Sequence, residues 1–563
     1  MTSMDCREII LSEQYYDYIV NLEQSEGSTN ILQNFSCYQQ INNQTVLLYA
    51  TEPYSLENTS YSTIPKCYGL MALENLTASG IYQLQQFPGL NLSGRGVMVG
   101  FVDTGIDYES PFFRNADGST RIEAIWDQTL NTGTVPREFL YGSEYTREQI
   151  DQALQSDQPA SIVPSRDDDG HGSALASIAA ASTGVTDTFF GAAPEAEIAV
   201  VKLKQAKQNL KGFYGISSEA AAYAEGDLIA GIWYLHRLAL ARLKSLVLCI
   251  GLGTSQGDHS GGSVVDNLIR YVSRQRWRAV VVAAGNEGNE RHHFSETIEQ
   301  QREYHDVELR VGEGVDGFAM ELWGERANVF TVSILSPSGE RIPRIPVNVE
   351  RSNIYRLLFD QTEVIVDYQI SEGEEGTFLA LIRFFGVASG IWTIRVYPAQ
   401  EINSAFHMWL PIQNFLTGEV YFLQPDPYVT ITGPSTVVQA VSVGAYDAGM
   451  QSLAVFSGRG FNLSNQVKPD IVAPGVEVSV LVSNERVGNR SGTSASAAIT
   501  AGAVALLFEW AVVRNNDPDI NGVEVGSLLI RGANRSLDRS YPNREWGYGT
   551  LDLYGALQEL QIQ

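Results

Sequence analysis

Apolar and polar positions follow two different patterns along the chain. Continuous apolar runs at residues 97–102, 245–250 and 279–284 each lead into a glycine-containing turn. Such runs are typical of parallel strands that are buried on both faces of a sheet. Stretches with helical periodicity, at residues 218–240 and 263–275, alternate with these runs. The alternation predicts an α/β fold with a doubly wound, mostly parallel sheet.

The pattern changes between residues 295 and 427, where short stretches alternate between turns. Six of them are expected to form strands, at residues 307–311, 317–323, 329–334, 364–368, 376–384 and 390–396. Short strands of this kind are typical of an all-β sandwich or jelly roll. The α/β pattern resumes near residue 428, so the all-β unit is predicted to be an insertion.

The first 65 residues contain two strand-like stretches, 16–20 and 45–49, separated by asparagine- and serine-rich segments. Residues 70–76 are interpreted as helical. We therefore expect a small α+β unit at 1–65, an α/β unit in two parts at 66–294 and 428–563, and the all-β insertion at 295–427.

The composition argues against several classes of partner. A net charge of −27 argues against binding to nucleic acid and to an anionic membrane surface. The four cysteines, Cys6, Cys37, Cys67 and Cys249, lack metal-binding spacing and are interpreted as free thiols. No apolar run reaches about eighteen residues, and the N-terminus has no apolar signal region. We therefore expect no membrane span and synthesis in the cytoplasm.

A run of small and apolar residues at 491–507 opens with the turn Gly492-Thr493-Ser494. A hydroxyl in the first turn of a buried helix lies beside free N–H groups and the positive end of the helix dipole, which favour developing negative charge. Ser494 is therefore a candidate nucleophile. The same pattern fits a serine that only caps a buried helix, so neighbouring motifs have to decide.

Two further residues supply what a serine nucleophile needs. A hydroxyl is a poor nucleophile at neutral pH, so an imidazole has to accept its proton and a carboxylate has to orient that imidazole. Asp103 follows the run 97–102, at a strand end where open α/β sheets place their sites. His171 stands between two glycines at the start of an alanine-rich helix. A capping aspartate and a buried structural histidine are the alternative interpretations.

Asn286 lies in a glycine-rich turn after the run 279–284. Its side-chain N–H₂ can donate to an oxyanion, and removing one such donor typically raises the barrier by ~3–4 kcal/mol. The alternative is a turn asparagine in a left-handed conformation. The acidic run 167–169 beside His171 is interpreted as capping and solvated, not as a cation site.

Four of these motifs resemble the signature blocks of the subtilisin family of serine proteases. They are Asp103-Thr104-Gly105, Gly170-His171-Gly172-Ser173, Ala284-Gly285-Asn286 and Gly492-Thr493-Ser494. Their order of Asp, His and Ser is that of the family. The resemblance covers about residues 67–290 and 430–560. It implies a serine endopeptidase with Ser494 as nucleophile, His171 as general base and acid, Asp103 as orienting carboxylate and Asn286 as oxyanion donor.

The resemblance also implies how a protein or peptide substrate binds. Its backbone would pair as an added strand, and the residues expected to line the cleft are Gly251, Leu252, Gly253, Ala284 and Gly285. The family usually has Ser-Leu-Gly where this chain has Gly-Leu-Gly, and Met-Ala-Ser/Thr-Pro where residues 495–498 stand. These departures affect the pocket and not the triad.

The long segment between Asp103 and His171, the insertion and the missing signal region resemble the Csp subtilases of clostridia. In those, a protease with a retained pro-segment and an inserted jelly roll activates a spore-cortex hydrolase during germination. By this resemblance, residues 1–65 are a pro-domain that assists folding and blocks the cleft, and self-cleavage falls between about residues 55 and 75. The same resemblance implies association with the spore coat or cortex.

Two other functions remain open from the sequence. Some Csp members have lost triad residues and bind partners without cutting, so a regulatory pseudoprotease is the main alternative. A serine esterase of the α/β-hydrolase class is weaker, because its Gly-x-Ser-x-Gly motif is absent at Ser494. Calcium is common in the subtilisin family, but no matching ligand loop is recognised, so no metal or other cofactor is expected.

Overall fold

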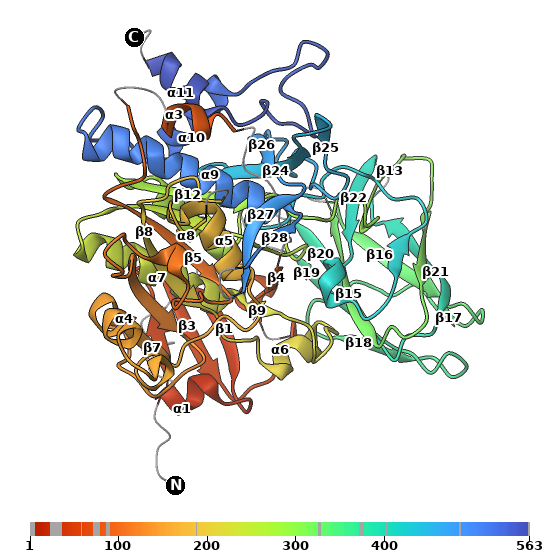
Figure 1. Ribbon diagram of the computed structural model, residues 1–563. Helices are drawn as coiled ribbons and strands as arrows, with labels where there is room; N and C mark the ends of the chain where they lie inside the picture. Colours follow the sequence, from red (N-terminus) through yellow and green to blue (C-terminus); the bar gives the residue numbers. More distant parts are fainter. Residues whose placement is uncertain are drawn as a thin grey trace.

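The structure is a computed structural model, shown in Figure 1. It describes residues 6–22, 37–57, 59–70, 79–85, 90–186, 189–324, 328–370, 377–400, 402–483 and 486–560.

The largest sheet has the strand order β25-β24-β12-β10-β5-β8-β6-β7, with β26 paired to β24. Its strands are β5 (Val97–Asp103), β6 (Ile122–Asp127), β7 (Ser143–Thr146), β8 (Glu197–Lys202), β10 (Ser245–Ile250), β12 (Arg278–Ala283), β24 (Val441–Asp447), β25 (Ser452–Leu453) and β26 (Ile471–Pro474). All neighbours pair in parallel except the edge strands β7 and β25. The predicted mostly parallel α/β sheet is confirmed, and we call this part of the molecule the α/β body.

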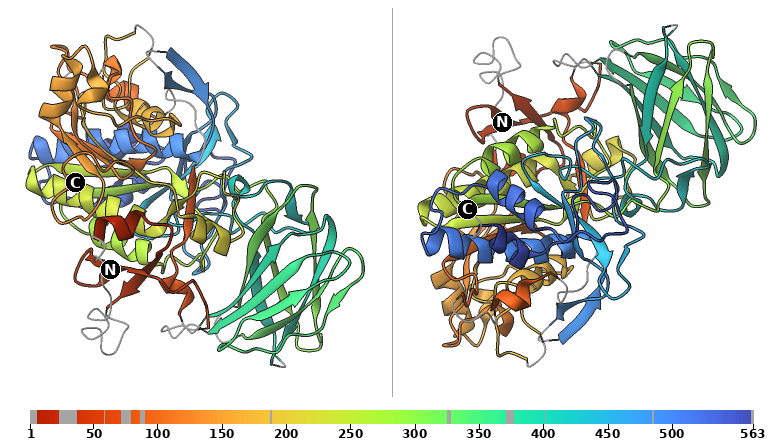
Figure 2. Two further views of the ribbon diagram at one scale, coloured as in Figure 1. Left: turned by 90° about the horizontal axis from the view of Figure 1, so that it is seen from below. Right: turned by 90° about the horizontal axis from the view of Figure 1, so that it is seen from above.

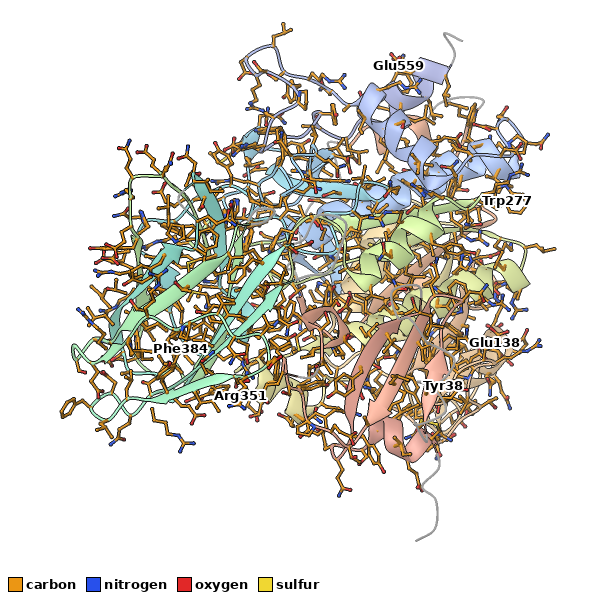
Figure 3. The ribbon with its side chains drawn as sticks, turned by 180° about the vertical axis from the view of Figure 1, so that it is seen from behind. Tyr38, Glu138, Trp277, Arg351, Phe384 and Glu559 are labelled. Carbon is orange, nitrogen blue, oxygen red and sulfur yellow. A yellow bond between two sulfur atoms is a disulfide. The ribbon has the colours of Figure 1, made fainter. Side chains whose placement is uncertain are left out.

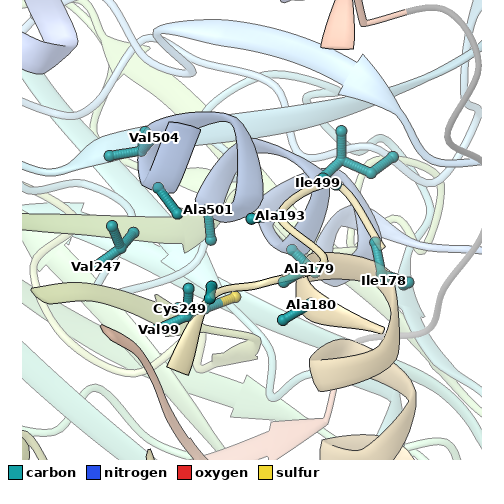
Figure 4. Close-up of a cluster of buried hydrophobic side chains, with 14 of the residues drawn as sticks. Val99, Ile178, Ala179, Ala180, Ala193, Val247, Cys249, Ile499, Ala501 and Val504 are labelled. Carbon is teal, nitrogen blue, oxygen red and sulfur yellow. The ribbon is translucent and has the colours of Figure 1, made fainter. Parts of the chain in front are cut away.

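Helices cover both faces of this sheet. Helices α5 (His171–Ala180) and α9 (Thr493–Phe508) pack on one face, against Val99 and Cys249. Figure 4 shows this cluster. Helices α7 (Glu225–Ala241) and α8 (Val264–Ser273) pack on the other face, against Met98 and Val102. Because both faces are covered, every residue of β5 is buried, which explains its unbroken apolar run.

Residues 493–513 form a stretch long and apolar enough to cross a membrane, and 83% of its most apolar window is buried inside the protein. Gly502 shows how tightly α9 is packed, because a Cβ there would lie 2.9 Å from the carbonyl oxygen of Ala179 on α5. We therefore interpret this stretch as the core helix of the α/β body.

Two antiparallel sheets occupy residues 293–422 and form a β-sandwich beside the α/β body (Figure 2). The six-stranded sheet contains β13 (His293–Ile298), β22 (Ser404–Trp409), β15 (Gly317–Gly324), β20 (Phe378–Phe385), β19 (Glu363–Ile370) and β18 (Asn353–Arg356), in that order. The five-stranded sheet contains β17 (Arg341–Ile342), β16 (Phe330–Leu335), β21 (Gly390–Pro398), β14 (His305–Val311) and β23 (Val420–Phe422). Their shared core includes Phe384 and Trp392. Figure 3 shows Phe384 on the β-sandwich, on the opposite side of the molecule from Tyr38.

The N-terminal residues form a small unit with helix α1 (Cys6–Leu11) and a sheet of order β1-β3-β2. Its strands are β1 (Tyr16–Asn21), β2 (Tyr38–Gln40) and β3 (Thr45–Ala50). Ile19 and Leu47 of this sheet pack in the same cluster as Leu228 of α7. An ion pair of 2.6 Å between Asp17 and Lys207 links the unit to the α/β body.

The prediction of four free thiols is wrong for two of them. Cys6 and Cys37 form a disulfide, with their Cα atoms 5.3 Å apart, whereas Cys67 and Cys249 are free and buried. No local pattern predicts this pairing, because only the fold brings the start of α1 beside β2.

The remaining helices and short strands connect these units. They are η2 (Tyr61–Thr63), β4 (Cys67–Leu70), α3 (Ile81–Gln85), η3 (Pro111–Phe113), α4 (Arg147–Leu154), η4 (Pro159–Ser161), α6 (Gln208–Phe213), β9 (Tyr223–Ala224), β11 (Leu252–Gly253), η5 (Gln413–Phe415), β27 (Val478–Ser483), β28 (Arg486–Arg490), the π-helical turn η6 (Glu509–Val513), α10 (Gly522–Gly532) and α11 (Leu553–Leu560). The helix expected at 70–76 is contradicted at Leu70, which ends strand β4, and residues 71–76 lie outside the described residues.

Candidate active site

Three side chains from distant parts of the chain meet at the carboxyl end of β5. Asp103 is the last residue of β5, His171 the first of α5 and Ser494 the second of α9. His171 Nδ1 lies 2.7 Å from Asp103 Oδ1, and His171 Nε2 lies 3.4 Å from Ser494 Oγ. All three are at most 2% exposed. With the proton on Nδ1 shared with Asp103, the lone pair of Nε2 faces the hydroxyl, which is the arrangement for proton abstraction from a serine.

Gly251 allows these groups to approach each other. A Cβ at this position would lie 3.0 Å from Ser494 Cβ and 3.2 Å from His171 Cε1. Contacts this short are tighter than most real Cβ contacts, so a larger residue would push on the serine and the imidazole. Residue 251 therefore borders the site directly, and the absence of a side chain matters to its geometry.

Hydrogen bonds to Asp167 connect the start of α5 to the loop after β5. Its Oδ1 accepts hydrogen bonds from Thr104 Oγ1 (2.7 Å) and from the backbone N–H of Gly170 (2.9 Å). Its Oδ2 accepts from the backbone N–H (2.8 Å) and the hydroxyl (2.6 Å) of Ser173. The expected capping role of the acidic run is therefore met by this residue. The sequence did not reveal its link to Thr104, which ties the loop of Asp103 to the helix of His171.

Asn286 lies in the turn after β12 and contacts the first residue of α9. Its Oδ1 accepts from the backbone N–H (3.1 Å) and the hydroxyl (2.9 Å) of Thr493, and the same hydroxyl accepts from the backbone N–H of Gly285 (3.1 Å). Because the amide oxygen is held by Thr493, the side-chain N–H₂ is directed to the other side of the amide. Sequence reasoning missed Thr493 as the residue that fixes this orientation.

Two of the other expected cleft residues, Ala284 and Gly285, have their backbone groups paired inside the protein. The N–H of Ala284 donates to Val443 and its carbonyl accepts from Thr432, while the carbonyl of Gly285 accepts from Gly458. Gly285 has a φ of 98°, in the left-handed region that favours glycine. These residues can shape the wall of a site, but their backbones are not available to pair with a substrate.

Comparison with known proteins adds an independent observation. The family model of the subtilase family matches residues 94–344 and 425–549, more than half of the chain. The chain belongs to the subtilase family.

A solved structure and two curated proteins resemble this subtilase. The structure of the Clostridium perfringens CspB protease matches with a TM-score of 0.76 and 31% identity, covering 86% of this chain and 98% of that one. Serine protease AprX of Bacillus subtilis is 33% identical over 134 residues, which is 20% of this chain and 29% of AprX. Subtilisin of Bacillus sp. strain TA39 is 24% identical over 223 residues, 39% of this chain and 41% of that protein. The chain thus spans less than half the length of these two curated relatives.

The expected peptide-binding strand of this subtilase is already paired with another part of the chain. Strand β4 lies between β9 and β11 in a three-stranded sheet. It runs antiparallel to β11, with Gly69 opposite Gly253 and Leu70 opposite Leu252. Tyr68 of β4 is 1% exposed and packs with Leu252. A segment of the protein itself therefore occupies the position where a substrate strand was expected.

Electrostatics around the site favour the serine over the free thiols as nucleophile. Burial raises the pKa of Cys67 to about 12, and burial together with the nearby Asp103 carboxylate raises the pKa of Cys249 well above its usual range. Both thiols therefore stay protonated at neutral pH, where a thiolate would be needed for reaction. In the part of the chain that the structure describes, no three His, Cys, Asp or Glu residues form a group that could hold a metal ion.

Proposed function

We propose that this subtilase is a serine endopeptidase. The observation that carries the proposal is the placement of His171 between Asp103 and Ser494. In this mechanism, Ser494 Oγ attacks the carbonyl carbon of the scissile peptide bond while His171 Nε2 takes the hydroxyl proton. Asp103 holds the ring orientation and stabilises the imidazolium. His171 then gives the proton to the leaving amine as the C–N bond breaks, and water releases the acyl group from Ser494 by the same two proton transfers.

Asn286 is the proposed oxyanion donor. The carbonyl oxygen of the substrate becomes negatively charged in the tetrahedral intermediate, and a donor fixed before the reaction stabilises it without reorganisation. Support comes from the two bonds that hold the amide oxygen on Thr493. The start of α9 adds a favourable helix dipole beside Ser494.

We also propose that the N-terminal unit is a pro-domain, that the β-sandwich is the inserted jelly roll, and that the chain cleaves itself after residue 71. The pairing of β4 with β11 supports this position. Leu70, the last residue of β4, lies opposite Leu252, and the residue before Leu252, Gly251, borders Ser494. The bond after residue 71 lies inside the interval of 55–75 expected from the sequence, and residue 71 is outside the described residues. We further propose a zymogen as the physiological substrate, as the resemblance to the Csp subtilases implies.

The test compares the wild-type chain with Ser494→Ala and with Ser527→Ala, a partly exposed serine on α10 that serves as the control. We expect the wild type and the control to react with a fluorophosphonate and to release a fragment that ends at residue 71, identified by mass spectrometry. Ser494→Ala should stay full-length and unlabelled, with a loss in kcat of about 10⁶-fold, the size of the effect when the subtilisin nucleophile is removed. A wild-type chain that is folded, full-length and unlabelled would favour the binding-only alternative.

A further inference from the structure

The segment before β4 lies against the β-sandwich before it reaches the triad. The carbonyl oxygen of Leu56 accepts from Gln369 Nε2 (2.6 Å) on β19. The carboxylate of Glu57 accepts from the backbone N–H of Ser352 (2.8 Å), next to β18. The β-sandwich therefore contacts the chain upstream of the strand that occupies the peptide position.

Tyr61 makes the most specific of these contacts. Its hydroxyl donates to Oε1 of Glu321 on β15, and its ring packs edge-on against Trp323 at a centroid distance of 6.0 Å. The other oxygen of Glu321 accepts from Trp323 Nε1 (2.8 Å) and from the backbone N–H of Gly257 (2.9 Å). Tyr61, Glu321 and Trp323 are each at most 8% exposed. Two donors thus orient the carboxylate toward the tyrosine hydroxyl.

This contact joins the β-sandwich to the strand that flanks the triad. Gly257 belongs to the loop that follows β11, so Glu321 is bonded to the same loop that leads away from Gly251. Tyr61 and Ile64 also pack in one apolar cluster with Phe213 of α6 and Leu381 of β20. Between β22 and β23 of the β-sandwich, η5 contacts β4 itself. The surface is therefore continuous from the peptide strand to β15.

We propose that this surface of the β-sandwich is an extended recognition site for protein substrates that carry a tyrosine ten residues before the residue whose carbonyl is attacked. The antiparallel pairing of β4 with β11 fixes the direction in which a peptide enters, so the upstream flank of any substrate strand bound in that register leads toward the β-sandwich. The occupant in the structure is such a flank, formed by residues 54–57 and 59–66. The inference rests on the proposed peptidase activity, and a substrate has to displace the protein's own segment to use the surface.

Glu321 gives this site its selectivity. Burial raises the pKa of the Glu321 carboxyl, while the three donors around it stabilise the carboxylate. A phenylalanine in place of the tyrosine would leave a buried carboxylate oxygen without its donor, which is costlier than the loss of an exposed hydrogen bond. The site should therefore distinguish tyrosine from phenylalanine.

The experiment uses two fluorogenic peptides with the sequence of this chain, a long one of residues 54–75 and a short one of residues 67–75. With wild-type enzyme we expect kcat/KM at least tenfold higher for the long peptide. Tyr61→Phe in the long peptide should remove most of this advantage, whereas Ser62→Ala, at a position exposed in the structure, should keep it. Glu321→Ala in the enzyme should lower kcat/KM by a larger factor for the long peptide than for the short one, and continued cleavage of the short peptide shows that the variant is folded.

Equal kcat/KM for the long and short peptides, or equal effects of the tyrosine and serine changes, would overturn the inference. Failure of the enzyme to cut either peptide would overturn the proposed activity instead. In that case the surface is still tested by fluorescence anisotropy, with the labelled long peptide bound to Ser494→Ala and to the double variant with Glu321→Ala. Binding that does not weaken in the double variant contradicts the recognition site.

Discussion

The α/β body and the β-sandwich place buried polar groups in different ways. In the α/β body, Asp103, His171 and Ser494 come from three elements and meet only because a strand ends where two helices begin. In the β-sandwich, Glu321 lies in the middle of β15, where Met320 and Leu322 face the sandwich core and Trp323 faces the α/β body. Side chains at the ends of several elements can meet and react with one another. A polar side chain on a strand face that is covered by another unit instead forms a contact between the two units.

This difference explains the uneven sequence signals. Strand β14 alternates buried and exposed residues, because its outer face meets solvent, whereas β15 is buried at every position. A carboxylate in a strand that is buried on both faces has to be satisfied locally, and here Trp323 and Gly257 supply the donors. If chemistry and packing are separated in this way, a change to the core of the β-sandwich should lower stability without lowering kcat.

The largest expected effect comes from emptying the core of the β-sandwich. Trp392→Ala removes a fully buried indole, and such changes cost about 3–5 kcal/mol in the free energy of unfolding. Thermal or denaturant unfolding should show this loss, while kcat for a short peptide at 25 °C stays unchanged because the triad is in the α/β body. The control is Ile391→Ala on the same strand, 46% exposed, with an expected effect within about 0.5 kcal/mol. A fall in kcat without unfolding would break the comparison.

The next effect concerns the oxyanion donor. Asn286→Ala should lower kcat by about 10²–10³-fold and change KM little, because the amide N–H₂ acts on charge that appears only in the transition state. Steady-state kinetics with a short peptide measures both constants. Asn289→Ala, an exposed residue in the same turn, is the matched control and should keep wild-type kinetics. A rise in KM with kcat unchanged would assign Asn286 to substrate binding instead.

A smaller effect is expected from the residue that connects the two loops of the triad. Asp167→Asn replaces one acceptor oxygen by an N–H₂ group that faces donors, so either Thr104 or Ser173 loses its bond. A displaced imidazole should lower kcat by about 10–100-fold with little change in KM, since misplacement of a reacting group by about 1 Å costs up to that much. The control is Asp168→Asn, whose side chain is 83% exposed. If both variants have the same kinetics, Asp167 only caps the helix.

The sequence predicted the site where a functional residue lies at a recognisable strand end or helix start. Asp103, His171 and Ser494 stood out because each lies at a predicted strand end or helix start, and the fold brings these three ends together. The contacts that depend on three-dimensional proximity could not be predicted. Among these are the Cys6–Cys37 disulfide, the hold of Thr493 on Asn286 and the pairing of β4 with β11. Each of these contacts joins segments that are far apart in the chain, and the local pattern of apolar and polar residues does not predict such contacts.

The smallest effect on activity is expected at Asp266, a carboxyl that is buried in the α/β body but has no proposed role in catalysis. Asp266 is buried in the capping box of α8, and burial raises the pKa of its carboxyl from 3.8 to about 7. The folded state therefore favours the protonated form, and the stability that this group contributes is full below about pH 4 and is lost as the pH rises through 7. Asp266→Asn is neutral at every pH and keeps an acceptor for the backbone N–H of Ser263. Its free energy of unfolding should lie above that of the wild type at pH 8, with no gain at pH 4.

Denaturant unfolding at the two pH values measures this difference, and kcat at pH 8 should stay at the wild-type value. Glu524→Gln provides the control, because Glu524 has the same position in the capping box of α10 but is exposed. Its change should give no stability gain that depends on pH. A gain for both variants would show that net charge is responsible, whereas a change in kcat for Asp266→Asn alone would place this buried carboxylate in the site. The same question thus applies to Asp266 and to Glu321: whether the hydrogen bonds of the buried carboxyl come from neighbouring residues of the protein or from a substrate.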